Sequence, residues 1–375
     1  MIAEGRDKSN ARSGAWRRRQ LLAAAALLLE GCAVHPPRPA LTAAQGARQD
    51  GIFLMADGAV LPYRAWLPQD RPRAVVLALH GFNDSRDAWE LPAPAFAAAG
   101  IGLIAPDQRG FGAAPGRGHW PGTATLVADA AHLARLVRER FPGVEVLAMG
   151  ESMGAAVLML LATSPLAPDR MRYVLLAPAV WGRAQMNLFA VAALWLAATL
   201  APGLRLTGAG LGVRASDNTE ALIRLSEDPL TIHATRISAI RGLVDLMGRA
   251  LEAAARFPAP GLFLYGGRDE LVPAHAMAAA WRALRAGERI GFYPDGYHLL
   301  LRDHDRAEVI GDVVSWITDP AAPLPSGAEA RARAWLAAHG GRHAPVLLGA
   351  GPLRAGPLHA NPETSWAPGG TSAGG

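Results

Sequence analysis

Short apolar runs alternate with longer segments of helical spacing through the middle of the chain. Each run is followed by turn residues, as in buried strands, and the segments between them, such as residues 123–141, read as helices. This alternation predicts an α/β fold with a mostly parallel central sheet and helices on both faces. The runs are "AVVLALHG" (74–81), "IGLIAPD" (101–107), "VEVLAMG" (144–150), "MRYVLLAPAV" (171–180), "PGLFLYGGRDE" (260–270) and "ERIGFYPDGYH" (288–298).

A hairpin is predicted ahead of the first apolar run. In residues 51–68, two runs of alternating polarity flank the pair Asp57-Gly58, which favours a tight turn. We expect these antiparallel strands at one edge of the sheet. Ligands of such sheets bind beyond the carboxyl ends of the parallel strands. Chemistry is therefore expected near residues that follow those strands: His80, Gly81, Asp107, Ser152, Asp269 and His298.

Two segments interrupt the pattern. Residues 181–256 form an insertion with helical runs, which predicts a helical cap between the first part of the core (51–180) and the second (257–319). Its run "MNLFAVAALWLAATLAPG" is apolar nearly all round, as a buried core helix would also be. We interpret it as a wall that presents Phe189 and Trp195 to a substrate. Residues 320–375 are rich in Ala, Gly, Pro and Arg and predict a disordered tail, with one helix possible over "SGAEARARAWLAAH" (326–339).

Composition and charge exclude several classes of function. Hydrophobic residues make up 51% and charged residues 18%, as in a globular protein. The net charge is +5, but residues 1–31 contribute +3 of it, and no basic run with interleaved aromatics follows, so a nucleic-acid partner is not expected. Cys32 is the one cysteine, which excludes an intramolecular disulfide and a cysteine-based zinc site.

The amino-terminal segment predicts export. "WRRRQLLAAAALLLEGC" (16–32) has a basic cluster, an apolar run too short for the roughly 20 residues of a membrane span, and then Cys32. Its end resembles a bacterial lipobox, apart from Glu30. We expect residues 1–31 to be a lipoprotein signal, Cys32 to be lipidated, and residues 32–50 to be a flexible tether. The protein would then be membrane-anchored and face the periplasm. Simple secretion or an uncleaved anchor are the alternatives.

A serine stands between two glycines in "GESMG" (150–154), after a predicted strand and before a predicted helix. That context is the one a nucleophile elbow requires. The sharp turn holds the hydroxyl clear of the sheet, and close neighbours leave room only for glycine two residues on either side. Ser152 is therefore the candidate nucleophile, and the positive end of the following helix favours an incipient oxyanion.

A serine nucleophile needs a base, and the base needs an orienting acid. His298, just after the last predicted strand, is the best candidate base. Asp269, at the end of the preceding strand, is the candidate acid, and the order Ser, Asp, His is that of α/β-hydrolases. As a turn residue, Asp269 could instead cap the helix that follows it. Two other carboxylates, Asp295 and Asp303, lie closer to His298 in sequence.

An oxyanion hole needs two backbone N–H donors. One is expected from Met153, the residue after the nucleophile. The other is expected from Phe82, because Gly81 lets the loop after the first parallel strand turn tightly.

Five motifs together carry a family resemblance over residues 50–318. The chain resembles the monoacylglycerol lipase and lysophospholipase branch of the α/β-hydrolase superfamily, although Ala155 stands where that branch usually has glycine. The resemblance implies an ester hydrolase with the triad Ser152, Asp269 and His298, a mobile cap that admits a monoacyl lipid, and no metal or cofactor. The motifs are "LHGFNDSRDAW" (79–89), "APDQRGFG" (105–112), "GESMGA" (150–155), "GGRDELVP" (266–273) and "GYHLLLRD" (296–303).

Other functions remain open on the same fold, because fold alone does not fix function. They are a small-ester carboxylesterase, a cofactor-free haloperoxidase, a C–C hydrolase and a non-catalytic lipid-binding lipoprotein. An epoxide hydrolase is excluded, since it would need a carboxylate at position 152.

Overall fold

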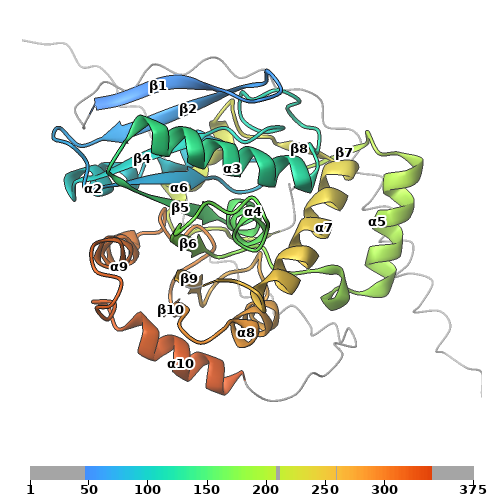
Figure 1. Ribbon diagram of the computed structural model, residues 1–375. Coiled ribbons are helices and arrows are strands. Elements are labelled where there is room, and N and C mark those ends of the chain that lie inside the picture. Colours follow the sequence, from blue (N-terminus) through green and yellow to red (C-terminus); the bar gives the residue numbers. More distant parts are fainter. Residues whose placement is uncertain (1–46, 208–211, 259, 340–375) are drawn as a thin grey trace, which may run out of the picture. The chain divides into compact units, whose positions relative to one another are not determined.

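A computed structural model describes residues 47–207, 212–258 and 260–339, and its centre is an eight-stranded sheet in the order β1-β2-β4-β3-β5-β6-β9-β10 (Figure 1). The two pairs that involve β2 are antiparallel, and the remaining pairs are parallel. The predicted edge hairpin and mostly parallel sheet are confirmed. The strands are β1 (Ala47–Leu54), β2 (Val60–Leu67), β3 (Ala74–Leu79), β4 (Ile101–Pro106), β5 (Glu145–Glu151), β6 (Tyr173–Leu176), β9 (Gly261–Gly266) and β10 (Arg289–Tyr293).

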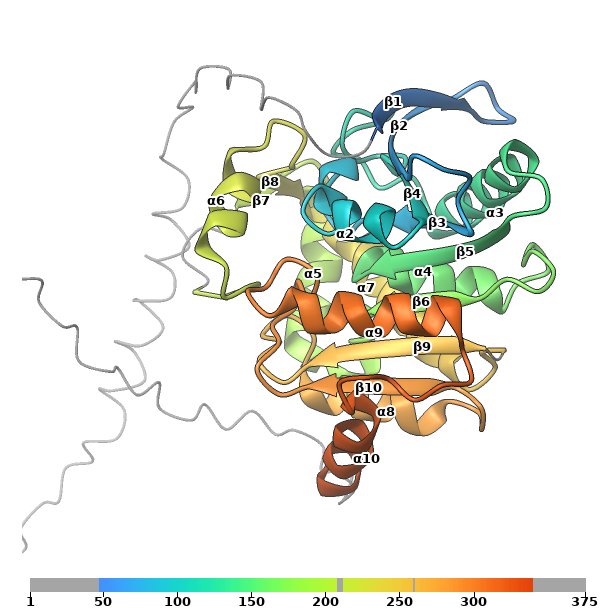
Figure 2. The same cartoon turned by 90° about the vertical axis from the view of Figure 1, so that its left-hand side faces the viewer.

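Helices cover both faces of the sheet, as predicted (Figures 1 and 2). One layer holds α3, α4, α7 and α8, and the other holds α2 and α9. β3, β4, β6 and β9 are buried along their whole length between these layers, which explains their unbroken apolar sequences. The helices are α2 (Ala93–Ala98), α3 (Thr123–Arg140), α4 (Met153–Ala162), α7 (Ile237–Ala254), α8 (Ala274–Ala283) and α9 (Arg306–Thr318), with a 3-10 turn η1 (Arg86–Trp89) before α2.

The predicted cap, residues 181–256, divides into two parts. Its first part is an insertion outside the core layers, and it includes a small antiparallel sheet of β7 and β8. Its last helix, α7, instead packs against α4 and α8 as a member of the core layer, with Leu246, Ala250 and Ala254 fully buried. The cap proper therefore ends near residue 236. Its elements are η2 (Arg183–Gln185), α5 (Leu188–Leu200), β7 (Arg205–Thr207), α6 (Thr219–Glu227) and β8 (Ala234–Arg236).

The prediction of a disordered tail from residue 320 is wrong for residues 320–339, whereas the helix considered possible over residues 326–339 is present. This segment contains a last helix, α10 (Ala328–Ala338), which packs along β10 (Figure 2). Trp335 of this helix stacks on Phe292 of β10 with ring centroids 5.1 Å apart, and it also contacts Tyr265 and Trp281. Aromatic burial of this kind outweighs a composition that is otherwise typical of disorder. Residues 340–375 lie outside the described part.

At the amino-terminal side, β1 begins at Ala47, so the prediction of a flexible tether over residues 32–50 is wrong for its last four residues. They pair with β2 from Ala47 opposite Leu67 onward. The predicted signal, residues 1–31, and the predicted lipidation site Cys32 lie outside the described residues. Within the described ranges, no helix has both the length and the apolar character needed to cross a membrane.

Candidate active site

Ser152 lies at a sharp turn between the last residue of β5 and the first residue of α4. Its backbone adopts φ 53° and ψ −112°, a left-handed conformation that costs a non-glycine residue about 1–3 kcal/mol. Backbone hydrogen bonds hold it there: its N–H donates to Leu176 O at 2.9 Å, and its carbonyl accepts from Ala179 N–H at 3.1 Å. Strain fixed by neighbouring strands is the signature of a nucleophile elbow.

The two glycines beside Ser152 are explained by close backbone contacts. A Cβ on Gly154 would lie 2.2 Å from the carbonyl oxygen of Leu79, at the end of β3. A Cβ on Gly150 would lie 2.5 Å from the backbone nitrogen of Ala155 in α4. Both distances are far below contact distance, so the elbow tolerates no side chain at either position. Ala155 itself is fully buried without such a conflict, so its difference from the usual glycine leaves the turn intact.

His298 and Asp269 form the expected base and acid pair. Nδ1 of His298 lies 2.8 Å from Oδ2 of Asp269, and both side chains are almost fully buried. The second carboxylate oxygen of Asp269 accepts the N–H groups of Leu271 at 2.8 Å and Val272 at 2.9 Å. Asp269 thus accepts hydrogen bonds from its own turn and from His298 at once. Since Nδ1 donates its proton to the carboxylate, Nε2 is left free to accept one.

The two other candidate acids have different partners. Asp295 pairs with Arg268 at the surface. Asp303 accepts from the hydroxyl of Ser216 at 2.6 Å and from the Tyr297 N–H at 2.7 Å. The choice of Asp269 agrees with this geometry.

The pKa of His298 is set by opposing effects. Burial lowers it, but the carboxylate of Asp269 and the more distant charge of Glu151 outweigh burial and leave the pKa above its usual 6.5. Those anions favour the imidazolium that forms when the base takes a proton from the nucleophile. The site is therefore arranged for general-base catalysis by His298.

The two residues expected to form the oxyanion hole lie on segments that flank Ser152. Met153 is the first residue of α4, where an N–H has no partner within the helix. Phe82 is the second residue of a turn closed by the Asp84 N–H on Gly81 O, in which Asn83 has φ 64°. The position of a Cβ on Gly81 is 3.5 Å from Cβ of Ser152, so this turn lies against the nucleophile. The donor role of both N–H groups stays a prediction.

Residues 70–305, more than half of the chain, match the sequence profile of the Hydrolase_4 family, described as "Serine aminopeptidase, S33". The chain belongs to this family. The expected relation to α/β-hydrolases of the monoacylglycerol lipase type is thus confirmed.

Individual relatives and structures agree. A monoacylglycerol lipase of Mycolicibacterium smegmatis is 28% identical over 72% of this chain and 97% of its own length. The structure of a soluble variant of Saccharomyces cerevisiae monoglyceride lipase has a TM-score of 0.63 at 20% identity, and the match covers 77% of this chain and all of that one. A carboxyl esterase of Bacillus coagulans has a TM-score of 0.62 at 21% identity, covering 72% and 98%. At such identities the structures establish the fold alone.

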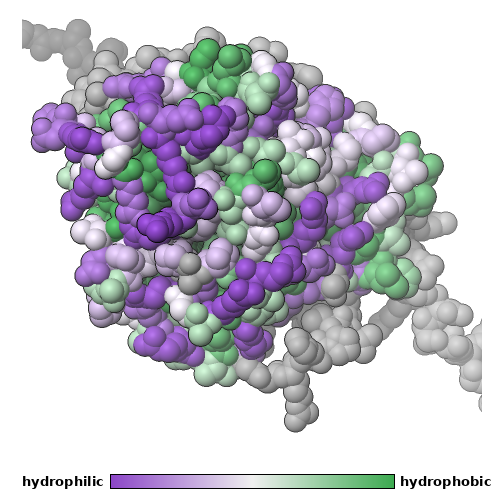
Figure 3. All heavy atoms as spheres, in the orientation of Figure 1, coloured by the Kyte–Doolittle hydropathy of each residue, from purple (hydrophilic) through white to green (hydrophobic). Residues whose placement is uncertain are grey.

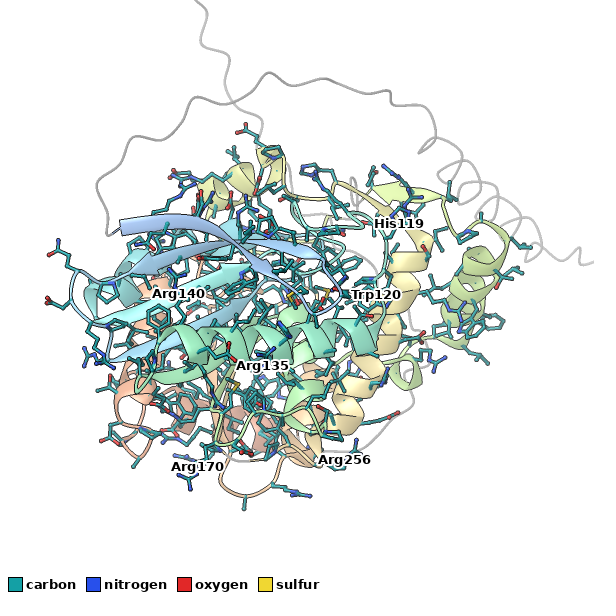
Figure 4. The ribbon with its side chains drawn as sticks, turned by 45° about the horizontal axis from the view of Figure 1, so that its top comes forward. His119, Trp120, Arg135, Arg140, Arg170 and Arg256 are labelled. Carbon is teal, nitrogen blue, oxygen red and sulfur yellow. The ribbon has the colours of Figure 1, made fainter. Side chains whose placement is uncertain are left out.

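In this Hydrolase_4 protein, an aromatic wall adjoins the loop after β3 that contains Phe82, here called the oxyanion loop. The ring of Phe82 lies 5.6 Å from Phe111 and 6.5 Å from Trp120, which Figure 4 labels beside α7. A Cβ on Gly242 of α7 would lie 2.3 Å from the Trp120 ring, so the indole fills the space between the loop and this helix. This wall was not predicted from the sequence. The tryptophan in the glycine-rich loop after β4 was the available signal.

The structure does not place the predicted substrate residues of the cap in an enclosed tunnel. Phe189 is 83% exposed on α5. Trp195 is 43% exposed, and the guanidinium of Arg241 lies 3.7 Å from its ring centroid. α5 contacts the rest of the fold chiefly through α7 and lies at the right edge of the molecule, where hydrophobic residues reach the surface (Figures 1 and 3). Binding of substrate by Phe189 and Trp195 stays a prediction.

The cap is tied to two of the catalytic segments. Toward the oxyanion loop, the Ile232 N–H donates to Asn83 O at 2.8 Å. Toward the loop of His298, the Leu299 N–H donates to Ala215 O at 2.9 Å, and Nδ2 of Asn218 donates to Arg302 O at 2.9 Å. Cap and catalytic loops are therefore positioned together.

A cavity of about 220 Å³ lies next to the loop of His298, but no member of the triad lines it; its walls include Asp217, Tyr293, Asp295 and Arg331. Several acidic residues line this cavity, but the described residues contain no group of three or more side chains that could hold a metal ion. We assign the reaction to the elbow of Ser152 and not to this cavity.

Proposed function

We propose that this protein is a serine hydrolase that cleaves carboxylic esters of monoacyl lipids, of monoacylglycerol or lysophospholipid type. The observation that carries the chemistry is the buried 2.8 Å contact between His298 and Asp269, beside a serine held at φ 53°. The substrate class rests on relatives named monoacylglycerol lipase and on the apolar surface of α5.

In the first half of the reaction, the Oγ atom of Ser152 bonds to the ester carbonyl carbon, and its proton passes to Nε2 of His298. The carbonyl electrons move onto the oxygen, where the N–H groups of Phe82 and Met153 and the amino-terminal end of α4 stabilise the negative charge. The tetrahedral intermediate then expels the alcohol, which takes the proton from His298. An acyl group remains on Ser152.

In the second half, a water molecule gives a proton to Nε2 of His298 and its oxygen bonds to the acyl carbon. The intermediate releases the fatty acid, and Ser152 recovers the proton from His298. Throughout, Asp269 holds the imidazole in one tautomer and offsets its positive charge without taking the proton.

Labelling with a fluorophosphonate tests the nucleophile. The wild type should be labelled at Ser152, and Ser152→Ala should lose labelling and at least about 10³-fold in kcat with an unchanged fold. Asp295→Asn is a matched control that removes a nearby carboxylate outside the triad. Labelling that persists in Ser152→Ala would refute the assignment.

A substrate panel tests the lipid class. Monoacylglycerols and lysophospholipids should be hydrolysed with higher kcat/KM than p-nitrophenyl acetate. The family description makes aminoacyl p-nitroanilides the necessary comparison. Faster cleavage of those amides would replace the lipid proposal with a peptidase.

We further propose that the protein is exported and anchored in a bacterial membrane through lipid on Cys32, facing the periplasm. The support is the basic and apolar pattern before this cysteine, together with a cap surface suited to lipid. Residues 181–216 contain Arg183, Arg205 and Arg214 but no acidic residue, and α5, with five large exposed apolar side chains, lies within this stretch of the sequence. Wild type should partition into the detergent phase and Cys32→Ser into the aqueous phase. An unmodified mature amino terminus other than Cys32, found by mass spectrometry, would contradict the anchor.

A further inference from the structure

One buried guanidinium joins the three segments on which the catalytic groups stand. Arg302 follows His298 by four residues, and its Nη2 atom contacts Oδ2 of Asp84 at 2.8 Å and also Oε1 of Glu151. Asp84 follows the oxyanion residue Phe82 by two positions, and Glu151 immediately precedes Ser152. The base, the oxyanion loop and the nucleophile are thus linked at a single side chain.

This cluster is buried and carries an excess of negative charge. Glu151 is 3% exposed, and Asp84 and Arg302 are each 6% exposed. Burying ions costs several kcal/mol each, and apolar residues of similar volume often stabilise a core as well or better. Two carboxylates against one guanidinium leave one charge in excess, and Nε of Arg302 has no hydrogen-bond partner in the described structure. Stability alone does not account for such an arrangement.

The cluster acts on His298 through Glu151. The charged groups that bear on the imidazole come from three places: Asp269 after β9, Glu151 at the end of β5, and Arg302 on its own loop. The two carboxylates raise the pKa of His298 and Arg302 lowers it. The pKa of Glu151 itself is raised, because burial and the neighbouring Asp84 carboxylate outweigh the opposing effect of Arg302. The guanidinium stays protonated, so it is the partner that allows a carboxylate to be charged here.

We propose that Arg302 is a positioning residue that fixes the elbow, the oxyanion loop and the loop of His298 in position relative to one another. The Glu151 carboxylate that Arg302 holds is then a second negative charge, after Asp269, that stabilises the imidazolium of His298. This inference rests on the proposed serine-hydrolase function. It assigns a role to the second residue of "GESMG", Glu151, and to an arginine outside the triad. Asp84 belongs to the same cluster but serves the oxyanion loop.

The test compares two variants that each remove one carboxylate from Arg302: Glu151→Gln and Asp84→Asn. The readout is the rate of fluorophosphonate labelling of Ser152 against pH, which needs the nucleophile and base but no knowledge of the natural ester. Glu151→Gln should move the acidic midpoint of the rate downward by about half a pH unit or more, since a nearby anion is lost. Asp84→Asn should lower the rate while keeping the midpoint of the wild type.

Variants of Arg302 test the positioning role. Arg302→Lys keeps the charge but cannot contact both carboxylates with a planar fork, so it should lose about tenfold in labelling rate, and Arg302→Met should lose more. Thermal unfolding of each variant separates loss of fold from loss of rate. If Glu151→Gln does not fold, Glu151→Asp should shift the midpoint in the same direction by less.

Equal midpoints in Glu151→Gln, Asp84→Asn and wild type would overturn the electrostatic role. Labelling rates in the Arg302 variants that equal the wild-type rate would overturn the positioning role. Either result, with a wild type that is labelled at Ser152, leaves the proposed function standing. A wild type that is not labelled at all would overturn both.

Discussion

Two helices of this protein, α4 and α5, have nearly the same apolar composition, and the fold places them in opposite surroundings. Nine of the ten residues of α4 are buried, between the sheet and the helices α3 and α7. In α5, Ala198 is the one buried residue, and Leu188, Phe189 and Leu200 are more than 70% exposed. A helix that is apolar all round therefore indicates apolar surroundings. These can be the protein's own core or an apolar ligand or surface that the protein binds.

The difference follows from what each helix must do. α4 presents its amino-terminal end to the nucleophile, so it must be fixed, and it is seated so closely on β3 that no Cβ fits at Gly154. α5 is part of the cap and is held mainly by one neighbour, α7. Under the proposed function, the apolar side chains of α5 meet lipid. Substitutions in the two helices test this difference.

The largest effect is expected from Gly154→Val. The valine side chain would clash with the backbone of Leu79, so α4 could no longer pack against β3. The protein should lose more than about 4 kcal/mol of stability or fail to fold. Chemical denaturation measures this. Gly311→Ala, in α9, is the control: no atom lies within 4 Å of its new Cβ, and better helix propensity should stabilise the protein by up to about 1 kcal/mol. Equal stabilities of the two variants would contradict a tight seat for α4.

A smaller effect separates the helices directly. Leu158→Ala in α4 removes a fully buried side chain and should cost about 2–5 kcal/mol. Leu196→Ala in α5 removes one that is 61% exposed and should change stability by no more than about 0.5 kcal/mol. Denaturant midpoints with equal m-values give both numbers. A similar cost at both sites would mean that α5 is covered in solution, for example by a second copy of the chain.

The function of α5 should appear in substrate preference. Each buried CH₂ of an acyl chain contributes about 0.8 kcal/mol, so Phe189→Asp should lower kcat/KM for esters of about eight carbons or more by roughly tenfold and leave acetate unchanged. Leu166→Asp, at another exposed apolar position, is the matched control and should affect neither. If the wild type is fastest on acetate, with a flat dependence on chain length, the lipid role of α5 is wrong.

The smallest effect is expected on chain-length preference: the ratio of kcat/KM for long esters to kcat/KM for short esters should hardly change with pH. His298 must be neutral to act as a base, and its pKa is raised, so kcat/KM should fall as the pH drops through a value above 6.5. α5 has no titratable side chain, so long and short esters should lose activity in parallel. Kinetics on both esters across the pH range test this, and a ratio that titrates would show that charged groups contribute to chain-length preference.

The raised pKa of His298 makes stability depend on pH in the direction opposite to activity. A proton binds more tightly to the folded protein than to the unfolded chain, so this contribution is fully present below about pH 6.5 and is lost as the pH rises through the folded pKa. Thermal unfolding of wild type against His298→Ala should show the difference shrinking toward alkaline pH.

The candidate triad could be chosen from the sequence because each of its three residues has a local signature. A serine between glycines, with a strand before and a helix after, needs little knowledge of the rest of the chain. Asp269 and His298 follow strands whose carboxyl ends must meet at one edge of the sheet. The geometry then agreed with the choice over Asp295 and Asp303.

The remaining features depend on contacts that no local pattern records. Arg302 looks like an ordinary surface charge until the fold brings Asp84 and Glu151, from two other segments, against it. Periodicity could not tell that α5 is exposed, because a uniformly apolar helix has no polar face to point outward. The order of residues 320–339 was underestimated for a related reason, although a helix over residues 326–339 was considered: one residue, Trp335, outweighs the Ala and Gly around it.

The seat of α10 on β10 has a consequence for how the chain folds. Tyr265, Trp281 and Phe292 are covered by the ring of Trp335, which is made late in synthesis, so the end of the sheet closes only when the last described helix arrives. A chain cut at residue 319 would keep every catalytic residue and yet expose an aromatic surface beside an unprotected edge strand, which favours aggregation.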